Sequence, residues 1–278
     1  MRLVKFFSGV AAMLAACSIA SASPILSQFG EGPAPSITSA GGWDGAYVNL
    51  TQEVNSQQNQ AAFPQLVSGP YSQLKIDFDF RISAGNGGGA DGMGVAYVPS
   101  SVYGTEGPAT LTAVAEEPNL TGAFGVGFDT FNNGADDAES ESSVSLHWDG
   151  ALVQTFGLDA SPLGIFENSE VHHAEIIVTP NGSGSNVTVN ISDPTQTVTA
   201  VDNVFIDGLL PYDGRMIFSA RTGGANSQQD IDNVRLMHMT GGNKPMTTVL
   251  YTFVPEPSSV SLVLMGLAGL ASMVRRRR

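Results

Sequence analysis

The chain has 278 residues, of which 42% are hydrophobic and 14% are charged, and 26 acidic against 12 basic residues give a formal net charge of −14. Such an acidic chain argues against nucleic acid or an anionic membrane surface as its partner. Cys17 is the only cysteine, so no intrachain disulfide can form and the fold depends on a large hydrophobic core.

The first residues have the layout of an export signal. Arg2 and Lys5 precede an apolar run that ends in the small-x-small motif ASA at residues 20–22. We predict a helical signal peptide at residues 1–22, with Ser23 as the first mature residue. The alternative is the LAAC motif at 14–17, which resembles a bacterial lipobox and would make Cys17 a lipidated N-terminus. Ordinary cleavage is favoured because the ASA site is complete and the chain has another anchor at its far end.

Between the two ends, helical periodicity is nearly absent and strand patterns recur. In QLKIDFDFRISAG, apolar residues alternate strictly with polar ones, which predicts a strand with one face in the core and one in water. The stretch HHAEIIVTPNGSGSNVTVNISD predicts a hairpin with its turn at 180–185. Further strands are expected at residues 94–98, 123–131, 144–148, 151–156, 215–220 and 231–237.

Many short antiparallel strands separated by Gly, Pro and Asn turns predict an all-β fold, an antiparallel jelly-roll β-sandwich. We expect one domain at residues 23–240 and no internal repeat. Residues 241–254 are expected to form a last strand and then a linker. The mature chain of about 230 residues is long enough to bury the core of one such sandwich.

The stretch GFDTFNNGADD is unusually rich in side-chain oxygens for a strand and its loop. Alternation points Asp129 away from the apolar face near the end of the strand, and the loop after it offers Asn133, Asp136 and Asp137. Calcium takes roughly six to eight oxygen ligands from carboxylates, amides and backbone carbonyls. The stretch therefore predicts either a calcium site or an acidic surface loop with nothing bound.

GVGFDTFNN resembles the VEFDTF-x-N strand and loop of legume lectins and of their L-type relatives in animal secretory pathways. The resemblance implies a concanavalin A-like fold with one Ca²⁺ held by Asp129, Asn133 and the backbone carbonyl of Phe131. Asn133 and the Phe131 ring would also contact a sugar. The second acid of the family pattern falls on Ala138 here, which leaves the adjacent Asp137, or else Asp136, as the remaining metal ligand.

Other parts of the family pattern are missing. The glutamate that helps legume lectins bind a transition metal is replaced by Gly127, and the family histidine falls on Ser143. His147 lies nearby, but a lone strand histidine is more often a polar-face residue. The resemblance therefore implies a calcium site without a transition-metal site.

GGGADGMGVAYV resembles the GADGLAF loop and strand of the same lectins. By this resemblance Asp91 would accept sugar hydroxyls after a cis Ala90–Asp91 bond; the alternative is a plain Asp-Gly turn. IFSARTGGANSQQDIDNVRL resembles the late GFSASTG strand and its variable loop, which makes Gly223 and Gly224 further candidate sugar contacts. Arg221 stands where small residues are usual. Together the resemblances span residues 41–237.

The C-terminus reads VPEPSSVSLVLMGLAGLASMVRRRR. Its apolar run at 260–274 would form a helix of about 22 Å, shorter than the roughly 30 Å of a bilayer core, and four arginines follow it at once. The alternatives are a plain membrane anchor and a sorting signal. Pro-Glu-Pro, a short apolar helix and an arginine cluster resemble the PEP-CTERM signal of Gram-negative bacteria. That resemblance implies transient inner-membrane anchoring by residues 255–278, exosortase processing, and export to the cell surface or extracellular matrix.

Loss of both ends would leave 6 of the 12 basic and 25 of the 26 acidic residues, a net charge of −19. The leading hypothesis is a secreted, calcium-dependent carbohydrate-binding protein of the exopolysaccharide or biofilm matrix, without enzyme activity. Its partners would be a glycan, signal peptidase and exosortase during processing, and a second copy if it forms a homodimer. A structural matrix protein with no working sugar pocket is the alternative, and a glycoside hydrolase is less favoured because no carboxylate pair is evident.

Overall fold

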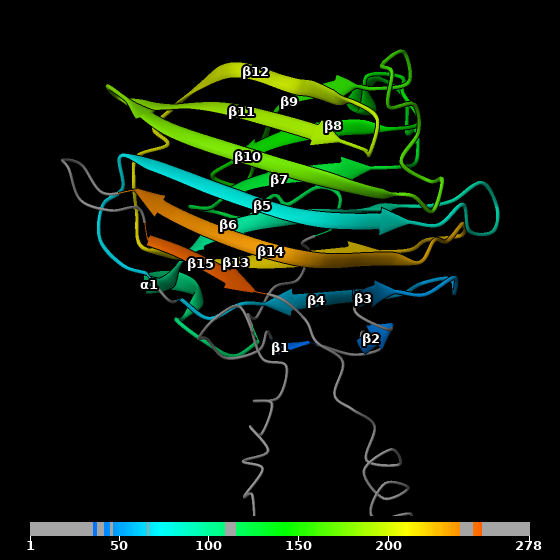
Figure 1. Cartoon of the computed structure of the whole chain (residues 1–278), viewed down its shortest axis with the longest axis horizontal. Helices are drawn as coiled ribbons and strands as arrows, with labels where there is room; N and C mark the ends of the chain where they lie inside the picture. The colour runs from blue at the N-terminus through cyan, green and yellow to red at the C-terminus, as the bar shows by residue number, and fades with distance from the viewer. Residues whose placement is uncertain are drawn as a thin grey trace, which may run out of the picture.

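The computed structural model describes residues 36–37, 42–44, 47–65, 67–108, 115–239 and 247–251. These residues form two antiparallel sheets that pack face to face with very little helix (Figure 1). The predicted all-β sandwich is confirmed. No helix in the described ranges is long and apolar enough to cross a membrane. The signal helix expected at 1–22 and the anchor helix expected at 260–274 lie outside those ranges.

Among the described residues, one sheet has seven strands and the other has eight. The seven-stranded sheet has the order β1 (Ser36–Ile37), β4 (Gln58–Ala62), β13 (Gly214–Arg221), β6 (Gly92–Pro99), β7 (Phe124–Asp129), β8 (Ser143–Trp148) and β9 (Ala151–Gly157). The eight-stranded sheet has the order β12 (Thr197–Asp207), β11 (Gly184–Ser192), β10 (Val171–Asn181), β5 (Gln73–Ile82), β14 (Gln229–Met239), β3 (Tyr47–Thr51) and β2 (Gly42–Asp44), and β15 (Thr247–Tyr251) also pairs with β14. The short helices are α1 (Ser100–Tyr103) and the 3-10 turn η1 (Ala135–Asp137).

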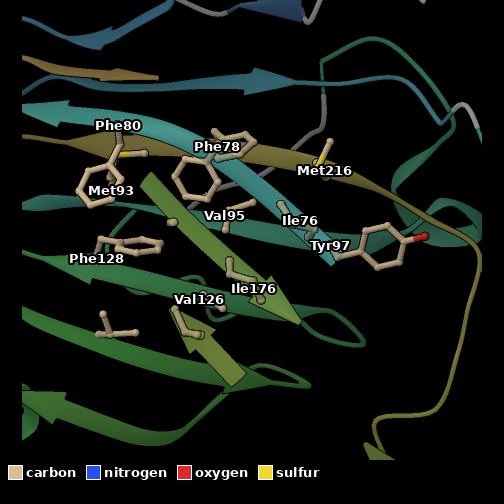
Figure 2. Close-up of a cluster of buried hydrophobic side chains, with 14 of the residues drawn as sticks. Ile76, Phe78, Phe80, Met93, Val95, Tyr97, Val126, Phe128, Ile176 and Met216 are labelled. Carbon is tan, nitrogen blue, oxygen red and sulfur yellow. The ribbon is translucent and has the colours of Figure 1, made fainter. Parts of the chain in front are cut away.

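The alternation in β5 builds one half of the core. Its apolar residues are buried, and Phe78 and Phe80 pack against Phe128 of the opposite sheet with ring centroids 5.6 and 5.2 Å away (Figure 2). The polar face of β5 departs from the expectation that it lies in water, because the outward-facing Asp77 is itself buried. Burial raises the pKa of Asp77, and Arg235 and Lys75 oppose that shift.

The six further strands expected from the sequence are present, with ends that differ from the predicted ones by at most two residues. The hairpin is also present, but its strands run on to Asn181 and restart at Gly184, so the turn is tighter than expected. The eleven-residue strand β12 was not anticipated. β15 falls inside residues 241–254, where a last strand before a linker is expected.

Strand register brings three chain segments together at one end of the seven-stranded sheet. Gly92 at the start of β6 pairs with Asp129 at the end of β7 and with Arg221 at the end of β13. Asp91 immediately precedes β6, so it lies at the same edge. Sheet pairing therefore places Arg221 beside Gly92, which lies 129 positions earlier in the sequence.

Candidate functional site

The stretch GFDTFNNGADD folds as the end of β7 followed by a compact acidic loop. Oδ1 of Asp129 accepts the backbone N–H of Phe131 at 2.7 Å. Oδ2 of Asp137 accepts the backbone N–H of Asn133 at 2.5 Å, and the Asn133 side-chain amide donates to the Phe131 carbonyl at 2.9 Å. These bonds draw all four expected ligands into one loop.

Asp129 and Asp137 are both buried. Burial raises the pKa of Asp129 to about 8, the negative charge of Asp137 adds to the shift, and the Phe131 N–H opposes it. Two neighbouring buried carboxylates are unfavourable when both are ionised, and a divalent cation between them removes that cost. The donor set therefore fits a hard cation.

The kind of cation follows from the other donors. In the described ranges, no three His, Cys, Asp or Glu side chains lie close enough to hold a metal by themselves. A cation here would need the Phe131 carbonyl, the Asn133 amide oxygen and water in addition to the carboxylates. Calcium accepts such mixed oxygen ligands, whereas transition metals favour imidazole or thiolate.

The structure distinguishes between Asp137 and Asp136, the two candidates for the remaining metal ligand. Asp137 is buried and hydrogen-bonded within the loop, and its charge acts on Asp129. Asp136 is exposed. Asp137 is therefore the better candidate ligand, and Asp136 lies apart from the group.

Asp91 lies beside this loop. The Ala90–Asp91 peptide bond is cis, as the sequence resemblance implies. The Asp91 carbonyl accepts the N–H of Thr130 at 3.0 Å, and the Asp91 N–H donates to the Arg221 carbonyl at 3.1 Å. Its carboxylate faces Gly223, where an added Cβ would lie 3.2 Å from both oxygens. Asp91 is thus hydrogen-bonded to the residue directly after β7 and to the end of β13, and its carboxylate faces the β13–β14 loop.

Arg221 is paired with two carboxylates. Its Nε lies 3.3 Å from Oδ2 of Asp91, and its Nη2 contacts Oε1 of Glu116. The Arg221 side chain is 46% exposed, that of Asp91 is 17% exposed, and that of Glu116 is 2% exposed. Arg221 therefore covers part of Asp91, which narrows access to the carboxylate from solvent.

Glu116 belongs to residues 115–119, here called the covering segment, which lies against the outer face of β6 and β7. A Cβ added to Gly94 would lie 2.1 Å from the Ala115 carbonyl oxygen. A Cβ added to Gly125 would lie 2.6 Å from Pro118, and one added to Gly127 would lie 1.8 Å from the Glu116 carbonyl oxygen. Glycines at these positions leave bare sheet backbone on which another backbone can lie. The space for any side chain at residue 127, including a metal-binding glutamate, is filled by this segment.

The covering segment also buries His147, whose ring nitrogens lie 2.7 Å from Asn119 Oδ1 and from Ser145 Oγ. Burial lowers the pKa of His147 to about 4. His147 is thus a satisfied, neutral histidine beneath the segment.

Two buried glutamates near the site were missed from the sequence. Burial raises the pKa of Glu116 to about 7 although Arg221 opposes the shift, and Glu116 Oε2 has no hydrogen-bond partner among the described residues. Burial also raises the pKa of Glu167 to about 7; Glu167 accepts the Ser227 hydroxyl at 3.1 Å and fills the space beside Gly89. The alternating glycines of β6 and β7 were the one sequence signal that another segment lies over that face.

The β13–β14 loop presents its residues to different surroundings. Gly223 adjoins Asp91, whereas a Cβ at Gly224 would meet no atom within 4 Å. Phe131 is 38% exposed at the rim of the acidic loop. Gln228, at the far end of this loop, lies on the side away from Asp91, where its side-chain amide donates to Asp230 at 3.0 Å. Asp91, Phe131, Asn133, Gly223 and Gly224 thus lie on three adjoining loops.

A family model for the PEP-CTERM protein-sorting motif matches residues 253–278. The C-terminus therefore carries this motif, as its sequence pattern predicts. No curated protein matches the chain significantly in sequence.

Solved lectin structures share the fold. The exoplasmic/lumenal domain of VIP36 in its Ca²⁺-bound form aligns with a TM-score of 0.58 and 14% identity, covering 83% of this chain and 96% of that one. Its Ca²⁺/Man2-bound form gives 0.57 and 17%, covering 80% and 89%. A Lotus tetragonolobus seed lectin gives 0.56 and 15%, covering 81% and 97%. The sandwich is lectin-like in fold.

Proposed function

We propose that the protein is a calcium-dependent carbohydrate-binding protein of the cell surface or exopolysaccharide matrix. One observation supports this proposal most: Asp91 lies beside the buried pair Asp129 and Asp137 at one edge of a lectin-like sandwich. The PEP-CTERM motif supports export and exosortase-dependent sorting in a Gram-negative bacterium.

Asp129 and Asp137, the Asn133 amide and the Phe131 carbonyl would hold the calcium ion. The ion would neutralise the two buried carboxylates and keep the loop in one conformation, so that less ordering remains when a ligand binds. VIP36 structures with Ca²⁺ and mannose-containing glycans show that a similar fold binds both.

A saccharide would meet complementary groups around this loop. Asp91 accepts hydrogen bonds from hydroxyl groups, the Asn133 amide donates or accepts, and the exposed Phe131 ring offers a face for sugar C–H groups. The open space at Gly224 leaves room for the ligand on the side of the β13–β14 loop. These groups bind and orient, and none of them is arranged as a nucleophile with its base.

A second candidate is a structural matrix protein with the same sandwich and no working pocket. The Arg221 guanidinium favours it, because it already occupies one side of Asp91. A glycoside hydrolase is less favoured because the solved relatives named above are lectins.

A glycan array separates these candidates when it is read with calcium and again with EDTA. We expect binding in calcium that is lost in EDTA, and loss of that binding in Asp91→Ala with the melting temperature unchanged within about 2 °C. Binding to no glycan in either condition favours the structural protein. Release of reducing sugar from a polysaccharide panel would reveal a hydrolase.

A further inference from the structure

A pocket separate from the Asp91 and Asp129 loops lies on the other flank of the same end of the sandwich. It has a volume of about 320 Å³. Its lining residues come from the β3–β4 loop, the end of β5, the segment before β10 and the start of β14: Glu53, Arg81, Ser83, Ser169, Gln228 and Asp230. Arg81 and Asp230 belong to the outer face of the eight-stranded sheet, where they are paired in register.

The floor of this pocket is the ion pair of Arg81 and Asp230. Nε and Nη2 of Arg81 donate to Oδ2 of Asp230 at 3.0 and 2.5 Å, and the Asn49 amide donates to Oδ1 at 2.8 Å. Asp230 is fully buried. The Arg81 guanidinium also lies 4.3 Å from the ring centroid of Tyr47, a cation–π arrangement. These contacts hold the guanidinium in one place.

The rim also contains internal hydrogen bonds. Ser83 Oγ donates to Glu53 at 2.7 Å and accepts the Gln228 N–H at 2.9 Å. The Ser169 N–H donates to the Ile82 carbonyl at 2.9 Å. Glu53 and Ser169 are exposed at the mouth. A ligand would therefore meet a Glu53 side chain that Ser83 already positions, so less side-chain entropy is lost when Glu53 binds it.

The chemistry of the lining selects the ligand class. All six lining side chains are polar, so an apolar ligand would desolvate hydrogen-bonding groups without replacing their partners. Arg81 and the buried Asp230 neutralise each other, so Glu53 is the charge that a ligand meets in this pocket; its carboxylate disfavours an anion and offers a metal cation a single acidic ligand. A neutral ligand with several hydroxyl groups can donate to Glu53 and exchange hydrogen bonds with the Ser169 hydroxyl at the mouth. The volume is at the lower end of the roughly 300–1,000 Å³ of small-molecule pockets, which suits one sugar unit.

We propose that this pocket is a second carbohydrate site that binds one neutral sugar unit without calcium. The inference rests on the proposed function in its ligand class, but it uses different residues. The β13–β14 loop connects the proposed calcium-dependent site with this pocket, since Gly223 adjoins Asp91 and Gln228 lines the pocket. Two sites on opposite flanks let a single copy hold two segments of polysaccharide and cross-link them.

The test uses an array of neutral oligosaccharides, and methyl glycosides of glucose, galactose and mannose followed by NMR, in calcium and in EDTA. We expect part of the binding to survive EDTA and to shift the backbone amide signals of Ser83 and Ser169. Glu53→Ala should weaken this EDTA-resistant binding by about tenfold, and Ser169→Trp should block it. Asp91→Ala should remove only the calcium-dependent part. Asp202→Ala, which removes an exposed carboxylate from β12, is the matched control and should change neither.

The outcomes distinguish the two proposals. Binding that vanishes completely in EDTA overturns the second site and leaves the calcium site standing. EDTA-resistant binding that persists unchanged in both Glu53→Ala and Ser169→Trp also overturns it, because the ligand then binds elsewhere. A third outcome is that all glycan binding resists EDTA and is lost in Glu53→Ala and Ser169→Trp. That result supports the second site and contradicts the calcium-dependent function.

Discussion

Gly127 lies directly under the backbone of Glu116, so that a Cβ at residue 127 would come within 1.8 Å of the Glu116 carbonyl oxygen. Because both partners are backbone, neither can move aside without lifting the covering segment. We expect Gly127→Ala to lower the free energy of unfolding by about 1–3 kcal/mol. Gly224→Ala is the matched control, since its Cβ would meet no atom within 4 Å, and it should change stability by less than about 0.5 kcal/mol. Urea unfolding of both variants measures the difference; equal stability would contradict the close packing.

Calcium affinity should depend on Asp137 and not on its neighbour. We expect Asp137→Asn to weaken calcium binding by about tenfold or more, because it removes a buried carboxylate from the loop. Asp136→Asn removes the same charge from an exposed position and should change affinity less than about threefold. Isothermal titration calorimetry with calcium measures both. A larger loss in Asp136→Asn would reverse the assignment.

The calcium-free protein should lose stability as the pH rises. The folded pKa of Asp129 is raised from 3.8 to about 8, so its contribution to stability is fully present below the unfolded pKa and is lost as the pH rises through the folded pKa. We expect the melting temperature in EDTA to fall between about pH 4 and pH 8. Glu116 and Glu167, with pKa values raised to about 7, act in the same direction.

Calcium should reverse that pH trend, because its ligands must be deprotonated. The stabilisation gained on adding calcium is therefore expected to grow towards pH 8. Asp129→Asn should flatten both curves. A melting temperature in EDTA that rises over this pH range would be inconsistent with a buried, uncompensated Asp129.

Arg221 and Glu116 should be energetically coupled. Arg221→Ala leaves the Glu116 carboxyl buried without its cation, so we expect the pKa of Glu116 to rise further and the free energy of unfolding to fall by about 1–3 kcal/mol at pH 8. Glu116→Gln removes that charge, so the double variant should be more stable than the sum of the two single losses predicts. A double-mutant cycle by urea unfolding gives the coupling. Simple additivity would show that the ion pair contributes nothing specific.

The sequence predicted those strands and site residues whose pattern is local. The strict alternation of β5 predicts its buried face because each residue reports its own orientation. β12 was not predicted because its apolar residues do not keep a period of two. Register shifts interrupt its pairing with β11 and disturb that period.

The site shows the same limit. Asp129, Asn133 and Asp137 could be proposed because they lie in one short stretch. Glu116 and Glu167 could not, since nothing in their own neighbourhoods reveals that tertiary packing buries them. Arg221 was noticed as a departure from the family pattern, but its pairing with Asp91 and Glu116 depends on strand register. Asp77 was placed in water because alternation cannot show what covers the outer face.

The long separation in sequence between Asp91 and Arg221 affects how the molecule matures. A chain is synthesised from its N-terminus, so both carboxylates that Arg221 neutralises are made more than one hundred residues before it. Until β13 is present they have no cation to pair with, and this edge of the sheet stays open. Completion of this edge therefore comes late in folding, after most of the sandwich has been synthesised.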